Sequence, residues 1–438
     1  MRIAVIGSGI AGLSAAWLLS QRHDVTVYEK DARVGGHANT VEARLGGRQA
    51  AVDTGFIVLN ERTYPNLLAL FAELGVTLRA STMSFAVSLD QGRLEYGGRD
   101  LRQVFAQKRN LASPRFMGMA LDILRFFRSA TALLARPQDH HLSLGDWLAR
   151  EGYGRAFMED HLLPMAAAIW SCPPSAMLAF PAASFVRFFD NHGLLQYANR
   201  PAWFTVAGGS RDYVSRIEAR LARPVRTACP VTGLRRVPAG VMLREAGGDE
   251  VFYDHAVVAA HADQALRLLS DPSPAEQAVL SAFAYQDNLA VLHSDPALMP
   301  RRQAVWSSWN YLGSGDGLAR RVSVTYWMNS LQGIDPALPL FVSLNPLREP
   351  APALVHGRFR YEHPVFDAAA MAAQARLPAI QGGRRTWFCG AWCGYGFHED
   401  GLAAGIAVAR SLGCDPPWPT SVGPYRAAAG GLAAAAGA

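Results

Sequence analysis

Four residues near the N-terminus have the types and spacing needed to bind a dinucleotide. Gly7, Gly9 and Gly12 form the sequence G-x-G-x-x-G, and Glu29 follows 17 residues after Gly12. In such a motif the first glycine permits a tight turn, the second lets the backbone approach a pyrophosphate, and the third lets a helix pack closely on a strand. A carboxylate at the position of Glu29 accepts hydrogen bonds from a ribose.

A second group of chemically active side chains lies near the other end, in CGAWCGYGFHEDGLAAGIAVA (389–409). Tyr395, His398, Glu399 and Asp400 stand directly before a run of small residues that is typical of a tightly packed helix. Such side chains transfer protons when their pKa suits the reaction. The two acids could equally cap the helix, and the histidine could be a structural hydrogen-bond partner.

Composition disfavours several other chemistries. The five cysteines are spread along the chain without a C-x-x-C pair, so we expect neither a disulfide framework nor a zinc site. His140 and His141 are adjacent in a predicted loop, and no histidine has metal-ligand spacing, so we predict no metal. The net charge is +6, with Lys30 and Lys108 as the only lysines, and no nucleic-acid motif accompanies it.

The first motif requires a strand, a turn, a helix and a second strand. RIAVIG (2–7) reads as a buried parallel strand, residues 13–20 continue a small-residue helix, and DVTVYE (24–29) is the second strand. Free backbone amides at the helix start, including those of Ile10 and Ala11, attract phosphate oxygens. The elements therefore agree with the spacing of the glycines.

The sequence after Glu29 indicates FAD. Arg33, Gly35 and Gly36 match the R-x-G-G element that follows the first unit in glutathione-reductase-like FAD families. The stretch 205–260 resembles the second FAD-contacting segment of flavin amine oxidases and phytoene desaturases. Besides the residues already named, that resemblance implies contacts from Lys30, His37 and the backbone of Val231, which meets the adenine.

The C-terminal group has a place in the same resemblance. TWFCGA (386–391) is the last strand of the pattern, and DGLAAGIAVA (400–409) starts a helix whose N-terminus faces the flavin. A helix start there would stabilise negative charge. Ala391 stands where related families often carry an acid that bonds the ribityl chain. The implied contacts are Gly390, Asp400, Gly401 and Leu402. There is no second intact G-x-G-x-x-G, so we expect no NAD(P)H domain.

We predict an α/β, glutathione-reductase-like two-domain flavoprotein. A Rossmann-type FAD domain comprises 1–80, 204–270 and 381–415. An α+β substrate domain with a mixed sheet, which contacts the membrane, comprises 81–203 and 271–380. The Ala/Gly-rich residues 416–438 form a tail with little fixed structure. Within the substrate domain we expect strands in 322–331 and 339–346, and a hairpin in 83–98 that turns at Gln91 and Gly92.

The segment 115–137 predicts an amphipathic helix. Its main apolar face contains Phe116, Met119, Ile123, Phe126, Phe127, Ala130 and Leu134. Arg115, Asp122, Arg125 and Arg128 lie on the other face. One interpretation is an ordinary helix packed on a core. The other is an interfacial helix with its apolar face in lipid and its arginines on phosphates; Met117, Leu121 and Leu124 widen the apolar stripe in its favour.

Five stretches together resemble one bacterial family. They are 52–67, 163–174, 180–195, 324–332 and 387–402, so the resemblance covers nearly the whole chain outside the tail. The family consists of FAD-dependent amine-oxidase-like flavoproteins and includes the methyl-branched fatty acid desaturase of furan fatty acid biosynthesis (UfaD-type). The resemblance implies a cytoplasmic oxidoreductase, peripheral on the anionic inner membrane surface. Its substrate would be a methylated, unsaturated phospholipid acyl chain, which it desaturates to a conjugated diene.

Such a reaction sends a hydride to flavin N5 and a proton to a general base. The candidate bases are His398, Glu399, Tyr395 and His192. Trp170, Phe188 and Phe189 could line an acyl channel or simply pack in the core. The alternatives are a flavin amine oxidase, a carotenoid- or porphyrin-type dehydrogenase, and a lipid-binding flavoprotein without turnover. The first is weakened because related amine oxidases hold a lysine near N5, whereas no lysine follows Lys108.

Overall fold

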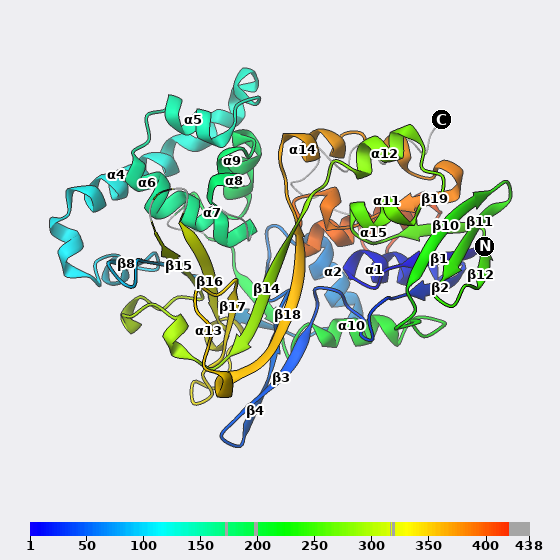
Figure 1. The fold of residues 1–438 in the computed structure, drawn as a ribbon, viewed down its shortest axis with the longest axis horizontal. Coiled ribbons are helices and arrows are strands. Elements are labelled where there is room, and N and C mark those ends of the chain that lie inside the picture. The colour runs from blue at the N-terminus through cyan, green and yellow to red at the C-terminus, as the bar shows by residue number, and fades with distance from the viewer. Residues whose placement is uncertain (171–173, 197–199, 316, 318–319, 420–438) are drawn as a thin grey trace.

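The computed structural model describes residues 1–170, 174–196, 200–315, 317 and 320–419. One half, on the right of Figure 1, contains both the first strand and the last helix of the chain. The other half contains a large sheet with a group of helices at its far end. Segments distant in the sequence therefore build each half.

A four-stranded parallel sheet lies at the centre of the first half. Its order is β19 (Thr386–Phe388), β13 (His255–Val258), β1 (Arg2–Ile6) and β2 (Asp24–Tyr28). The apolar residues of β1 and β13 are almost fully buried, as expected of parallel strands covered on both faces. The helices α1 (Ile10–Leu19) and α15 (His398–Ser411) pack against each other beside this sheet. The N-terminal strand, turn, helix and strand predicted from the sequence are confirmed.

Smaller elements complete this half. A three-stranded meander follows helix α10 (Arg211–Glu218), and helix α2 (Pro65–Leu74) contacts α15. The meander consists of β10 (Val231–Val237), β11 (Gly240–Glu245) and β12 (Glu250–Tyr253). Two further small sheets pair β3 (Thr40–Leu45) with β4 (Arg48–Asp53), and β9 (Trp203–Val206) with β5 (Leu59–Asn60) and β6 (Leu78–Ser81).

A seven-stranded mixed sheet organises the second half. Only β15 and β7 pair in parallel; the other neighbours are antiparallel. The order is β18 (Val355–Pro364), β14 (Tyr285–His293), β17 (Phe341–Leu344), β16 (Arg321–Trp327), β15 (Trp309–Ser314), β7 (Phe85–Leu89) and β8 (Leu94–Gly97). The predicted mixed sheet and the predicted hairpin are therefore confirmed. The strand expected in 322–331 ends at Trp327, because Met328–Gln332 forms helix α13.

Most of the helices at the far end share an aromatic core, while α3 (Leu101–Val104) packs beside β8. Phe126, Phe157, Phe185 and Phe189 are almost completely buried in this core. The helices at this end are α3, α4 (Pro114–Ser129), α5 (Leu144–Arg150), α6 (Arg155–Phe157), α7 (Leu163–Trp170), α8 (Pro174–Leu178) and α9 (Ala182–Asn191). The remaining ones, α11 (Ala262–Leu268), α12 (Pro274–Leu280) and α14 (Ala368–Gln374), lie toward the first half (Figure 1).

Helix α4 corrects one interpretation of the sequence. Phe116, Met119 and Phe126, which we considered for a lipid-facing surface, are buried against the protein. Arg125 does not offer a free charge, because it pairs with Asp122 and lies 4.1 Å from the ring centroid of Tyr153. The main apolar stripe is thus an ordinary core face. Within the described part of the chain, no helix has the length and apolarity needed to span a membrane.

The C-terminal segment makes one contact with the first half. Residues 416–419 form neither helix nor strand, as expected of a tail with little structure, and the indole ring of Trp418 stacks on Trp17 of α1 with centroids 5.9 Å apart. The rest of the predicted tail, 420–438, lies outside the described residues.

Candidate cofactor and active site

The glycine motif forms an open cradle between β1 and α1. Gly7 has φ +107°, a conformation that favours glycine, and its amide donates to the Tyr28 carbonyl of β2 at 2.8 Å. A Cβ atom on Gly12 would lie 1.9 Å from the Gly7 carbonyl oxygen, so helix and turn touch. In contrast, a Cβ atom on Gly9 would have no described atom within 4 Å. Space is therefore left beside Gly9, where a pyrophosphate would approach.

The start of α1 provides unpaired amides at this cradle. Gly9 is the N-cap and has no side chain to satisfy them, and the first helical hydrogen bond runs from the Leu13 amide to the Gly9 carbonyl at 2.9 Å. The amides of Ile10, Ala11 and Gly12 consequently lack helical acceptors. No acidic residue lies in the first turn. The helix end is prepared for an anion, as the sequence predicts.

Glu29 is held at the end of β2 next to the cradle. Its Oε2 accepts hydrogen bonds from the amide and the hydroxyl of Ser8, at 3.0 and 2.6 Å, and its Oε1 accepts one from the Asp31 amide at 2.9 Å. The Glu29 carbonyl accepts the amide of Cys229 at 2.9 Å. This bond brings the segment before Val231 to the same edge, although about 200 residues separate the two in sequence.

The residues after Glu29 form a loop that closes over the cradle. The Gly35 amide donates to the Ser8 carbonyl at 3.0 Å, and Gly36 lies against Gly9, where a Cβ atom on Gly36 would be 3.0 Å from the Gly9 Cα. Arg33 donates to the carbonyls of Gly36 and Ala38. The guanidinium therefore shapes the loop instead of pointing freely into solvent.

Two further predicted cofactor contacts differ in exposure. Lys30 is exposed and pairs with Asp31 at 3.5 Å. The Nε2 atom of His37 is buried and has no hydrogen-bond partner among the described residues. Burial lowers the pKa of His37 well below its usual value, so the ring is neutral. An unpaired buried ring nitrogen beside the glycine cradle fits a missing ligand.

Helix α15 begins at His398, two residues earlier than we expected. The amide of Gly401 donates to the Phe397 carbonyl at 3.1 Å, so it is paired within the helix. The unpaired amides of the first turn are those of His398, Glu399 and Asp400. Any backbone stabilisation of a negative charge comes from these three residues and not from Gly401 or Leu402.

Glycines let α15 lie directly on α1. A Cβ atom on Gly401 would be 2.9 Å from the Ile10 side chain, and one on Gly405 would be 2.4 Å from the Ala11 carbonyl oxygen. Leu402, which lies between Gly401 and Gly405 in the sequence, is fully buried. Gly390 precedes this helix in a fully extended conformation with Trp392 packed against it. The two distant glycine-bearing segments therefore meet at the start of α1.

Asp400 and Glu399 are both engaged by backbone amides. The carboxylate of Asp400 accepts the Phe397 amide at 2.9 Å, so it caps its own helix. Glu399 reaches to the start of α2 and accepts the Asn66 amide, the Asn66 side-chain amide and the Leu67 amide at 2.8 to 3.0 Å. Burial raises the pKa of each carboxyl to about 7. The capping interpretation is thus confirmed for Asp400, and Glu399 caps a different helix.

His398 and Tyr395 are also held by protein partners. The Nε2 of His398 lies 2.8 Å from the Tyr213 hydroxyl, and its ring stacks on Phe56 with centroids 3.8 Å apart. Burial lowers the pKa of His398 to about 3. Tyr395 is buried, which raises its pKa, while hydrogen bonds to Ser184 and Arg187 act in the opposite direction. Both side chains are thus held in place by protein partners near the start of α15.

His192, at the end of α9, differs from the other three candidate bases. Its Nδ1 lies 2.9 Å from the Phe188 carbonyl, so Nδ1 carries the proton and Nε2 is the acceptor. Among the described residues, the hydrogen bond of the His192 ring is made by Nδ1 and none is made by Nε2. Burial lowers the pKa of His192 to about 4, which keeps the ring neutral. The ring lies 5.7 Å from that of Phe397, the N-cap of α15.

Sequence reasoning missed a polar group on β18. The Tyr361 hydroxyl lies 2.7 Å from the Thr54 hydroxyl and 2.9 Å from the Asn39 side chain, and its ring is 5.0 Å from that of His37. His363 is two residues further along β18, and its ring is 5.3 Å from that of His37. The two-residue period of a strand could have indicated that Tyr361 and His363 share a face.

These residues fit a flavin dinucleotide: the site combines an open glycine turn, unpaired amides, a carboxylate at the end of β2 and a neutral histidine with a free nitrogen. They offer less to a metal, since no group of three or more His, Cys, Asp or Glu side chains stands at ligating distance in the described residues. The predicted Trp170, Phe188 and Phe189 are buried in the aromatic core and pack against one another.

Comparison with known proteins agrees with this fit. The family model described as "Flavin containing amine oxidoreductase" matches residues 10–294. Among solved structures, the cyclohexylamine oxidase from Brevibacterium oxydans IH-35A superposes with a TM-score of 0.69 at 16% identity, covering 94% of this chain and 99% of that one. The CLA-producing fatty acid isomerase from P. acnes superposes with a TM-score of 0.63 at 17% identity, covering 93% and 98%.

A curated protein matches over a short stretch. The 4,4'-diapophytoene desaturase (4,4'-diaponeurosporene-forming) from Staphylococcus aureus (strain bovine RF122 / ET3-1) is 51% identical over 43 residues. That stretch covers 10% of this chain and 9% of the desaturase. The short match therefore says little about the rest of either protein.

Proposed function

We propose that this chain, which belongs to the family of flavin-containing amine oxidoreductases, desaturates a hydrophobic acyl chain. The family match makes the protein an FAD-dependent oxidoreductase, and the predicted cofactor is confirmed. The substrate we propose is a methyl-branched, unsaturated fatty acyl chain of a phospholipid, which becomes a conjugated diene. This substrate is the one that the resemblance found in the sequence implies.

The observation that carries the proposal is the aromatic surrounding of the α15 start. Phe397, the N-cap residue, stacks on Phe188 with ring centroids 5.1 Å apart, and Phe188 in turn stacks on His192 at 3.9 Å. The two histidines nearest this point, His192 and His398, are neutral because burial lowers their pKa to about 4 and about 3. An apolar, aromatic surrounding whose histidines are neutral suits a hydrocarbon chain.

The chain's own residues account for the proton in this reaction. FAD, when bound, supplies the two-electron oxidation by accepting a hydride from the substrate. The Nε2 atom of His192 takes the proton from the neighbouring carbon, and the electron pair of that C–H bond forms the new double bond. The hydrogen bond from Nδ1 to the Phe188 carbonyl orients the ring for this role. Glu399, His398 and Asp400 hold the start of α15 in place.

Two comparisons support a hydrocarbon substrate. One of the structurally similar proteins is named as a fatty acid isomerase, and the curated match is named as a desaturase. The absence of lysine after Lys108 also disfavours the amine oxidase mechanism considered above. These are arguments for the substrate class, since the structural identities of 15–17% concern the fold.

Anaerobic mixing tests the proposal. The FAD-loaded protein is mixed with phospholipid that carries a methyl-branched monounsaturated chain, with the straight-chain analogue as a control, and with an amine series. We expect the visible flavin absorbance to bleach with the branched lipid, and mass spectrometry to show that the lipid loses two hydrogens. Bleaching by amines but not by lipid would overturn the proposal in favour of an amine oxidase.

The desaturase match supports one alternative. The 43-residue similarity is to an enzyme named as a 4,4'-diapophytoene desaturase. Another protein of similar fold, from Exiguobacterium sp. 255-15, is named as a putative protoporphyrinogen oxidase and has a TM-score of 0.62 at 15% identity. A polyene or porphyrinogen that bleaches the flavin faster than every acyl lipid would favour this alternative.

A further inference from the structure

Large apolar side chains are exposed almost solely at the helical end of the molecule. Among the described residues, six large hydrophobic side chains are exposed, and all but Met1 lie between positions 101 and 124. Leu101 is 75% exposed and Leu121 is 65% exposed. We define the apolar patch as Leu101, Leu111, Met117, Leu121 and Leu124. Such a concentration on one short segment is typical of an interaction surface.

The patch uses the face of α4 opposite to its core face. Met117, Leu121 and Leu124 follow one another at spacings of four and three residues, which puts them on one side of a helix. Phe116, Met119 and Phe126 are buried on the other side. Leu111 lies in the short 3-10 turn η1 (Lys108–Ala112), which contacts α4. The exposed residues are therefore additional to those that pack the helix in place.

Positive charge is concentrated on the same segment. Residues 99–128 contain seven Arg or Lys and two Asp, which gives a net charge of +5 within a chain whose total is +6. Arg102, Lys108 and Arg128 form no ion pair within the described part of the chain. Apolar side chains interleaved with free cations are the pattern of an interfacial helix.

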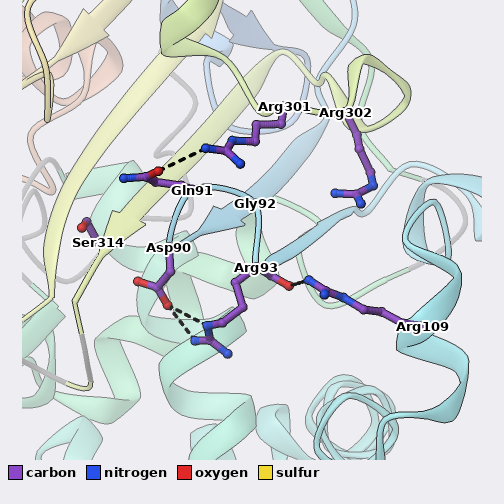
Figure 2. A pocket seen from close by; sticks show the side chains of 8 residues that line it. All are labelled: Asp90, Gln91, Gly92, Arg93, Arg109, Arg301, Arg302 and Ser314. Atoms are coloured by element: carbon purple, nitrogen blue, oxygen red, sulfur yellow. Dashed lines mark hydrogen bonds and ion pairs between the residues drawn. The ribbon is translucent and has the colours of Figure 1, made fainter.

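An arginine-lined hollow adjoins the patch. It has a volume of about 770 Å³ and is open to solvent. Figure 2 shows its lining residues, which are Asp90, Gln91, Gly92, Arg93, Arg109, Arg301, Arg302 and Ser314. They come from the β7–β8 turn, η1, the end of β15 and the segment after β14. Arg109 connects hollow and patch, because it lies in η1 two residues before Leu111.

Two of these arginines have no carboxylate partner. Arg301 donates to the neutral side chain of Gln91 at 3.1 Å, and Arg109 donates to the Arg93 carbonyl, as the dashed lines in Figure 2 show. Neither forms an ion pair with a described residue. Arg93 and Arg302 do pair, with Asp90 and Glu95. Two unpaired guanidinium groups at one hollow are suited to phosphate oxygens.

We propose that the apolar patch and the arginine-lined hollow together dock the protein on membranes that contain anionic phospholipids. The apolar side chains enter the acyl boundary while Arg109 and Arg301 bind lipid phosphates. Charge complementarity selects this occupant, since a hydrophobic patch of a second copy would bring the same positive charges together. In Figure 1 this surface lies at the opposite end from α1 and β1, so docking leaves the cofactor half unobstructed.

The proposal does not rest on the proposed reaction, because binding to vesicles can be measured without turnover. The FAD-loaded full chain is sedimented with vesicles of phosphatidylcholine alone or mixed with phosphatidylglycerol. We expect binding to the mixed vesicles, weakened by added salt, and at least about tenfold weaker binding to the neutral ones. Equal binding to both kinds of vesicle, or no binding to either, would overturn the proposal.

Three double variants distinguish the parts of the surface. Arg109→Glu with Arg301→Glu changes the hollow, and Leu101→Glu with Leu121→Glu changes the patch. The control matched to the hollow variant is Arg44→Glu with Arg220→Glu. It makes the same charge change as the hollow variant, but at two exposed arginines elsewhere. We expect the first two to lose about tenfold or more in vesicle affinity and the control to lose much less.

Each variant's bound flavin absorbance and circular dichroism show whether it is folded. All six changed residues are exposed. We therefore expect all three variants to keep both signals. A hollow variant that binds like the control would overturn the role of the arginines. A patch variant that converts a dimer to a monomer without affecting vesicle binding would show that the patch joins two copies instead.

Discussion

The cofactor half and the helical end use their side chains in opposite ways. Around α1 and α15, glycines remove side chains so that backbone approaches backbone, and the carboxylates of Asp400 and Glu399 are paired within the protein while the first amides of α1 lack helical acceptors. Around α3 and α4, apolar and cationic side chains are exposed, and Arg109 and Arg301 lack acidic partners. The comparison teaches that the cofactor half offers backbone amides at a rigid glycine turn, whereas the helical end offers apolar and cationic side chains to an external partner.

The largest effect expected in the cofactor half comes from Gly12→Val. The added Cβ would lie 1.9 Å from the Gly7 carbonyl, so α1 must move away from the turn and FAD is lost. Gly9→Ala is the matched variant: no described atom lies within 4 Å of its Cβ, so the protein folds but binds FAD more weakly. Thermal unfolding and flavin titration check both. Normal FAD affinity in Gly9→Ala would contradict the position of the pyrophosphate.

The next largest effect distinguishes His192 from His398, the two histidines close to Phe397. His192→Ala should slow flavin reduction by about 100- to 10,000-fold, because it removes the group with a free Nε2. His398→Ala should slow it far less, because its Nε2 is engaged with Tyr213. Stopped-flow reduction of FAD-loaded variants measures both rates. Equal losses would show that His192 has no special role in proton transfer.

A pH dependence of stability tests whether the cofactor half holds the carboxyl group of Glu399 in a buried environment that raises its pKa. Burial raises the pKa of Glu399 from 4.5 to about 7, so its contribution to stability is complete below pH 4.5 and is lost as the pH rises through 7. Glu399→Gln cannot titrate. The unfolding free energy of the wild type minus that of the variant should therefore fall by about 3 kcal/mol over this range. Denaturant unfolding at several pH values measures it, and a constant difference would contradict the raised pKa.

The smallest effect is expected at the helical end. Leu121→Ala should change the free energy of unfolding by no more than about 0.5 kcal/mol, because the side chain is exposed. Phe126→Ala on the opposite face of α4 should cost about 3 to 5 kcal/mol, because that ring is buried. Urea unfolding compares the two. A large loss in Leu121→Ala would mean that the patch is part of the core.

Local patterns predicted the elements well where spacing alone carries the information. The turn at Gly7, the helix after it and the strand before Glu29 follow from residues within one short stretch. The hairpin around Gln91 and Gly92 was equally local. The end of β16 was misjudged: the β-branched and aromatic residues stop at Trp327, and Met328–Gln332 forms a helix in which the Asn329 side chain donates to the carbonyl of Leu338. A contact with a residue outside the short stretch of sequence under inspection cannot be predicted from that stretch.

The sequence by itself determined that a glycine turn, a helix and a ribose-binding acid would assemble an FAD site, since their spacing is a property of the local chain. Only the tertiary structure decided which polar groups remain available. Glu399 meets Asn66 across 333 residues, and His192 faces Phe397 from another helix. It also decided which face of α4 is exposed. A side chain's pairing and burial depend on partners brought close by folding, and these partners leave no mark in the neighbouring sequence.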